Sequence, residues 1–171
     1  MNEKWNILNR KGYLKIHVAV NIKTKEILAL EITDEKVYDG KVMPRLIEHI
    51  LKRKDDKDVK IESVLGDGSY DSNENFKYLQ KNKIKPVIKV RKNSIISSKN
   101  NSLRNREVYS QWEDLLKWKK KCIYGKRWMA ETVFSSIKRM FGEYVSATRF
   151  QNMVKEMTMK ISLYNLFRRI A

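Results

Sequence analysis

Hydrophobic and polar residues alternate from Tyr13 to Val20, a pattern that predicts a strand with one buried face. The apolar residues on that face are Leu14, Ile16, Val18 and Val20. The stretch "NIKTK" contains turn-forming residues and is followed by a second apolar run, Ile27 to Ile32. These two runs therefore predict a β-hairpin.

The remaining elements follow from changes in the period of the apolar residues. Helical spacing predicts helices over 41–51, from a cap at Asp71 or Ser72 to about residue 82, over 127–141 and over 151–170. Short apolar runs predict strands at 61–65 and in "KPVIKV", and the basic, polar stretch 91–106 is predicted to be a loop. This order predicts an α/β fold, a mixed sheet flanked by helices, in one domain over residues 1–171.

The charge of the chain indicates its partner. The 37 Lys and Arg exceed the 20 Asp and Glu and give a formal charge of +17, which favours binding to a polyanion such as nucleic acid. A single cysteine, Cys122, excludes an intrachain disulfide, and two histidines give no zinc-ligand spacing, so a bound metal should have oxygen ligands. The apolar runs are far shorter than the roughly 20 residues of a membrane span, so we expect no membrane partner and a cytoplasmic, nucleoid-associated location.

Asp67 is a candidate site residue because it follows the predicted strand 61–65 in "GDGSYDS". Ligands bind to open α/β sheets beyond the carboxyl ends of strands. Gly66 and Gly68 on either side have no side chains, which leaves room for an ion or anion near the backbone. The alternative is that Asp67 only caps a turn.

Glu131 is the second candidate, on the helix predicted over 127–141. Glu131 and Lys138 lie on one polar stripe, about two turns and on the order of 10 Å apart. The adjoining apolar stripe consists of Ala130, Val133, Phe134, Ile137 and Met140. The alternative is a solvated helix face with an Arg127–Glu131 pair that contributes a few tenths of a kcal/mol.

Four of these residues share the spacing of a known signature. Tyr124, Arg127, Glu131 and Lys138 resemble the Y-x2-R-x3-E-x6-K signature of DDE-type insertion-sequence transposases, and "GDGSYDS" resembles the block around their second catalytic Asp. The stretches "GYLKIHVAV", "TDEKVYDGK", "PVIKVRKN" and "LYNLFRRI" extend the resemblance over nearly the whole chain. The resemblance implies a ribonuclease H-like fold and metal-dependent cutting and joining of DNA.

The resemblance also implies a role for each matching residue. Asp67 and Glu131 would be catalytic and would bind Mg²⁺, with Mn²⁺ as a possible substitute. Tyr124, Arg127 and Lys138 would contact DNA, at the transposon ends and the target. The protein would act as a homodimer in its DNA complex.

The chain departs from the family pattern near its start. The family's first catalytic Asp lies on the first, central strand, and the twelve residues before Tyr13 contain no Asp. We therefore expect a sheet without this strand, an impaired catalytic domain and no upstream end-recognition domain. Two other interpretations stay open: an inactive, basic DNA-binding remnant, and another ribonuclease H-like nuclease, against which the signature spacing argues.

A basic segment supports a DNA partner. From Lys81 to Arg106 there are nine Lys or Arg and no acid, although such runs are often solvated faces. Trp112, Trp118 and Trp128 are candidates for stacking on unpaired bases, and core packing is favoured for Trp128. His17 and His49 are expected to be structural. The last helix is expected to close the core through Met153, Val154, Met157, Ile161, Tyr164 and Phe167.

Overall fold

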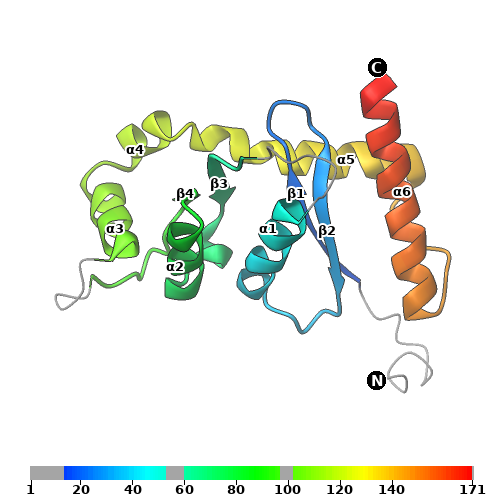
Figure 1. Cartoon of the computed structure of the whole chain (residues 1–171), viewed down its shortest axis with the longest axis horizontal. Helices are drawn as coiled ribbons and strands as arrows, with labels where there is room; N and C mark the ends of the chain where they lie inside the picture. The colour runs from blue at the N-terminus through cyan, green and yellow to red at the C-terminus, as the bar shows by residue number, and fades with distance from the viewer. Residues whose placement is uncertain (1–13, 53–59, 97–101, 171) are drawn as a thin grey trace. The chain divides into compact units, whose positions relative to one another are not determined.

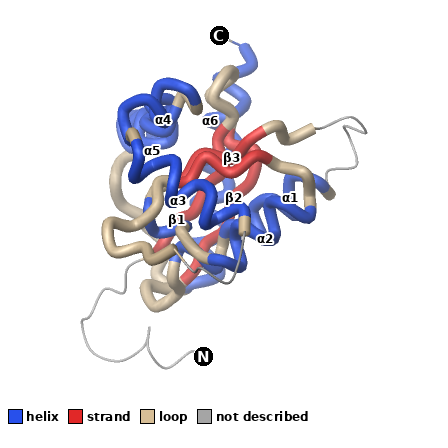
Figure 2. The backbone as a smooth tube through the Cα atoms, turned by 90° about the vertical axis from the view of Figure 1, so that its left-hand side faces the viewer, coloured by secondary structure: helices blue, strands red, loops and turns tan. Residues whose placement is uncertain are grey.

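The computed structural model describes residues 14–52, 60–96 and 102–170, and these residues form two compact units (Figure 1). One, called the hairpin unit, comprises Met1–Val37 and Trp128–Ala171, and the other, called the parallel unit, comprises Tyr38–Arg127. The segment before Tyr13 and most of the charged stretch after Leu51 lie outside the described residues. Helices and loops account for most of the described chain, and the strands are short (Figure 2).

The hairpin unit contains an antiparallel pair of strands, β1 (Lys15–Val20) and β2 (Ile27–Thr33), which confirms the predicted hairpin. Helices α5 (Met129–Phe141) and α6 (Phe150–Ile170) pack against it, and α6 runs beside β2 in Figure 1. The four apolar side chains of the first predicted strand all contact the core, as their alternation predicts. The buried members of this core are Ile27, Val133, Ile137, Met157, Ile161 and Tyr164.

The parallel unit is built around two strands joined by a helix. The strands β3 (Ser63–Gly66) and β4 (Lys85–Ile88) run parallel, with α2 (Asn73–Lys81) between them in sequence. The other helices are α1 (Met43–Leu51), α3 (Leu103–Glu113) and α4 (Leu115–Lys121). The strand pair has apolar neighbours on both faces: Ile88 packs with α1 and α2, whereas Val87 packs with Trp118 and Tyr124. Burial on both faces is typical of parallel strands.

Helix α3 was not predicted, because the stretch to Arg106 has the composition of a loop. Ser102 caps the helix, and its hydroxyl accepts a hydrogen bond from the backbone N of Asn105 (3.2 Å). The buried residues of α3 include two amides, Asn105 and Gln111. Gln111 donates to the carbonyl of Ile88 (2.9 Å) and accepts from the N of Val90 (3.0 Å), so polar contacts replace part of the apolar stripe.

Several large side chains differ from their predicted burial. Trp128 is 55% exposed, so its predicted core role is wrong, whereas Trp118 is buried and cannot stack on a base without leaving the core. Met140 (45%) and Phe167 (49%) are also exposed, although both were predicted to lie on apolar faces. His17 is buried and its ring bonds the Thr33 hydroxyl (3.0 Å), in agreement with a structural role.

The mixed α/β class is confirmed, and the described strands form two small sheets, β1-β2 and β3-β4. Within the described ranges, none of the helices is long and apolar enough to cross a membrane.

Candidate active site

Asp67 lies immediately after β3, at the carboxyl end of the strand. Its Oδ1 accepts hydrogen bonds from the backbone N of Ser69 (2.9 Å) and from the Ser69 hydroxyl (2.5 Å), which caps the short 3-10 helix Gly68–Tyr70. Asp67 is exposed, and no described residue donates a hydrogen bond to its Oδ2. Asp67 can therefore cap the turn and bind a ligand at the same time, because Oδ1 accepts the hydrogen bonds of the turn and Oδ2 accepts none from the described residues.

The space beside Gly66 is filled by protein. A Cβ at Gly66 would lie 3.1 Å from the ring of Tyr70, so the glycine admits Tyr70 rather than a ligand, contrary to the expectation from sequence. Burial, and then the negative charges of Asp39 and Asp67, raise the pKa of Tyr70 to about 12. Both carboxylates thus lie near the same phenol, and Asp39 is an acidic neighbour that sequence analysis did not select.

Two side chains also missed from sequence hold the turn after Asp67. The amide of Asn75, which is buried, donates to the carbonyls of Gly40 (2.9 Å) and Tyr70 (3.0 Å). The Tyr38 hydroxyl donates to the carbonyl of Ser69 (2.5 Å). The only sequence signal for Asn75 is its place beside Phe76 on the buried face of α2.

Tyr124 and Arg127 belong to the same unit as Asp67, in a 3-10 helix (Tyr124–Trp128). The α-helix predicted from residue 127 begins at Met129 instead. The Tyr124 ring is buried and stacks at a tilt on Trp118, with ring centroids 5.2 Å apart. Burial raises the pKa of Tyr124, Asp67 raises it further, and the charge and hydrogen bond of Arg127 oppose both. The phenol of Tyr124 therefore lies near both Asp67 and Arg127.

Glu131 and Lys138 belong to the hairpin unit, on α5. Both are exposed, while Val133 and Ile137 on the opposite face are buried, as the predicted stripes require. Lys138 forms a long ion pair with Glu143 (3.8 Å) just beyond the helix end. The signature thus spans the boundary between the units, with two residues in each.

Asp67 in the parallel unit and Glu131 in the hairpin unit each carry an exposed carboxylate, a group that suits a hard divalent cation. Among residues 14–52, 60–96 and 102–170, there is no cluster of three His, Cys, Asp or Glu side chains that could hold a metal ion.

Residues 2–166 match the family model of the transposase DDE domain, and this match covers nearly the whole chain. The chain belongs to the DDE transposase family, whose members use divalent metal ions and act on DNA in transposition. No solved structure matches the chain at a significant level.

Proposed function

We propose that the chain is the catalytic domain, with a ribonuclease H-like fold, of a transposase of the Y-R-E-K signature group. Its reaction would be metal-dependent phosphodiester cleavage and strand transfer at transposon ends. The observation that carries this proposal is the Asp67 turn, which presents a carboxylate at the carboxyl end of a parallel strand. Ser69 donates hydrogen bonds to one carboxylate oxygen, and the hydroxyl of Tyr124 lies near both Asp67 and Arg127.

In the proposed reaction Asp67 and Glu131 would hold Mg²⁺, or Mn²⁺ in its place. Such an ion, when bound, would supply Lewis-acid activation of the attacking oxygen and charge neutralisation at the leaving oxygen. The chain contributes carboxylates whose orientation is set before the ion binds: Ser69 fixes Asp67, and the helical register of α5 fixes Glu131.

Arg127 and Lys138 are the proposed phosphate contacts. Arg127 approaches Tyr124 in the parallel unit, which also carries Asp67. Lys138 is exposed near the end of α5, two turns after Glu131 in the hairpin unit. The buried ring of Tyr124 limits its DNA contact to the hydroxyl group.

We further propose that two copies act together on DNA, at the nucleoid, and that residues 1–171 belong to one catalytic domain. The alternative within the same family is a DNA-binding remnant without catalytic activity.

The test is a nicking assay on DNA carrying the element's ends, with Mg²⁺ or Mn²⁺. Asp67→Asn and Glu131→Gln should each abolish the metal-dependent activity that the chain retains. Asp34→Asn, at an exposed turn, and Glu113→Gln, on an exposed helix end, are matched controls that should have no effect. Equal activity of Asp67→Asn and the parent chain would exclude the proposed catalytic role.

The DNA-binding alternative has its own supporting observation. Trp112 is 55% exposed on α3, and α4 follows directly with four lysines in seven residues. An exposed indole beside lysines suits stacking on unpaired bases. Trp112→Ala should weaken binding to single-stranded DNA about tenfold without changing the melting temperature. Tyr109→Ala, at another exposed position of α3, is the control.

A further inference from the structure

Asp71 has the most complete set of polar contacts around the Asp67 turn. Its side chain is fully buried, and both oxygens accept hydrogen bonds. Arg104 donates from Nε to Oδ1 (2.7 Å) and from Nη2 to Oδ2 (3.0 Å). Oδ2 also accepts from the Ser94 hydroxyl (2.9 Å) and from the backbone N of Arg91 (3.0 Å). One carboxylate therefore joins three segments: the turn after β3, the loop after β4 and the first turn of α3.

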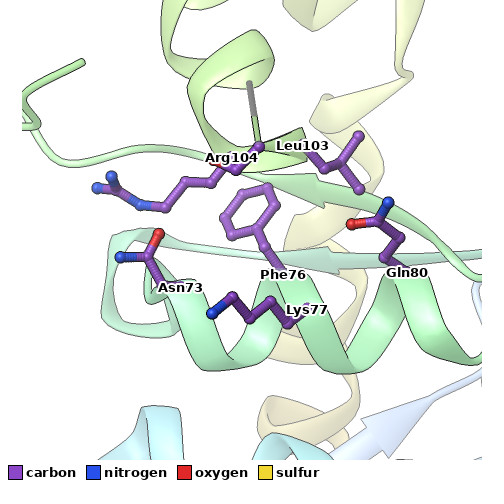
Figure 3. A pocket seen from close by; sticks show the side chains of 7 residues that line it. Asn73, Phe76, Lys77, Gln80, Leu103 and Arg104 are labelled. Atoms are coloured by element: carbon purple, nitrogen blue, oxygen red, sulfur yellow. The ribbon is translucent and has the colours of Figure 1, made fainter. Parts of the chain in front are cut away.

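The two parallel hydrogen bonds from Arg104 to Asp71 offset the cost of burying the two charges. Burial raises the pKa of the Asp71 carboxyl, but the bonds from Arg104, Arg91 and Ser94 together outweigh burial and leave the pKa below its ordinary value. Arg104 lies at the start of α3. Its side chain extends beside Phe76 of α2, and its guanidinium points away from Leu103 and Gln80 (Figure 3). Arg104 also donates to the Ser94 hydroxyl (3.0 Å), so all three side chains bond one another.

The contacts continue from Asp71 to the turn that carries Asp67. Asp71 holds the backbone of Arg91, and the Arg91 side chain donates from Nε to the carbonyl of Gly68 (3.0 Å). Arg91 also bonds the Tyr38 hydroxyl, which in turn bonds the carbonyl of Ser69. Gly68 and Ser69 are the two residues directly after Asp67, and Ser69 donates hydrogen bonds to its carboxylate. Two of the nine basic residues in 81–106, Arg91 and Arg104, thus make hydrogen bonds within the protein.

We propose that Asp71 is a positioning residue, which acts through Arg104, Ser94 and Arg91 to hold the Asp67 carboxylate in the orientation that binds a divalent cation. The inference rests on the proposed function, because it assumes that Asp67 is a metal ligand. Groups that orient metal ligands typically change metal affinity 10- to 100-fold when they are removed. Without Asp71 the Asp67 carboxylate keeps its hydrogen bonds from Ser69, but the backbone of Arg91 loses its bond to Asp71 while the Arg91 side chain bonds Gly68.

The experiment is a titration of the full chain with Mn²⁺, followed by the relaxation of water protons, well below the melting temperature of every variant. Asp71→Asn should weaken Mn²⁺ binding about tenfold. Arg104→Lys keeps the charge but cannot donate two parallel bonds, and it should weaken binding in the same direction, so the test does not depend on one variant folding. Ser102→Ala removes the cap of α3 and destabilises the same helix without touching Asp71, and it should leave Mn²⁺ affinity unchanged.

A second measurement is independent of metal. Amide hydrogen exchange at Ser69 and Tyr70 in the metal-free chain should become faster in Asp71→Asn and stay unchanged in Ser102→Ala. If Asp71→Asn and Arg104→Lys bind Mn²⁺ as tightly as the parent while Asp67→Asn does not, Asp71 is structural and the inference is wrong. If Asp67→Asn also binds Mn²⁺ normally, both the inference and the proposed metal site are wrong.

Discussion

The two units hold their proposed catalytic side chains by different means. In the hairpin unit, Glu131 stands on α5, and its direction follows from helical register once Val133 and Ile137 are buried. In the parallel unit, Asp67 lies in a turn whose shape depends on contacts with residues far away in the sequence, through Arg91 and Arg104. A regular helix thus needs only its buried apolar face to orient a side chain, whereas this turn is held by a polar network.

The largest expected effect is the loss of the buried carboxylate in the parallel unit. Asp71→Ala leaves the Arg104 guanidinium, whose side chain is 15% exposed, without its partner. Removing one member of a buried pair typically costs about 3–5 kcal/mol, so we expect the free energy of unfolding to fall by about 4 kcal/mol in urea denaturation. Asp67→Ala, in the same turn but exposed, should cost about 1 kcal/mol, the typical contribution of a capping residue. Similar losses in both variants would show that burial of the network does not matter.

The corresponding change in the hairpin unit removes the packing that fixes Glu131. Ile137→Ala creates a cavity between α5 and the core, and such truncations cost about 3 kcal/mol. Met140→Ala, one turn further along and 45% exposed, is the control and should cost less than about 1 kcal/mol. Urea denaturation again measures both, and an equal loss in the two variants would contradict the observed register of α5.

A smaller loss of stability is expected at the turn after α5, which is held by hydrogen bonds to Glu156 of α6. Glu156 accepts hydrogen bonds from the backbone N of Ser146 (2.9 Å) and Ala147 (2.9 Å) and pairs with Lys160 (2.8 Å). The bond from Lys160 and then the two backbone bonds lower the pKa of Glu156 to about 2. Because the carboxylate remains about a quarter exposed, Glu156→Gln should cost only about 1 kcal/mol at neutral pH.

The sign of the pH dependence follows from the lowered pKa. The folded state holds its proton more weakly than the unfolded state, whose Glu pKa is about 4.3, so the contribution of Glu156 is complete above that pH. It is lost as the pH falls from about 4.3 to about 2. The difference in urea midpoint between the parent chain and Glu156→Gln should therefore shrink over this range, and a constant difference would show that the charge is not involved.

The same contrast explains which features could be predicted from sequence. The hairpin, α1, α2 and the buried stripe of α5 follow from the period of apolar residues, and the candidate residues of the signature follow from their spacing. Helix α3 was missed because Gln111 and Asn105 occupy buried positions as amides. The sequence makes Asp71 only a candidate helix cap, yet Ser72 caps α2 and Asp71 pairs with Arg104, 33 residues later. Periodicity carries no information about such a pair.

The smallest predicted effect concerns Lys138, the proposed phosphate contact of the hairpin unit. Its ion pair with Glu143 is 3.8 Å long and joins two exposed side chains, so it should contribute at most about 0.5 kcal/mol to stability. Glu143→Gln removes the competing carboxylate and makes Lys138 more available to phosphate. We expect unchanged stability and about twofold tighter DNA binding at low salt, measured by fluorescence anisotropy.

Glu113→Gln in the parallel unit removes the same negative charge from another exposed position and is the matched control. If the gain came only from the higher net charge of the chain, both variants would bind DNA more tightly by the same factor. A gain restricted to Glu143→Gln, and abolished when Lys138 is also changed to Gln, would show that Lys138 contacts the DNA. Raising the salt concentration should reduce the gain, because each phosphate contact releases counterions and therefore weakens as salt rises.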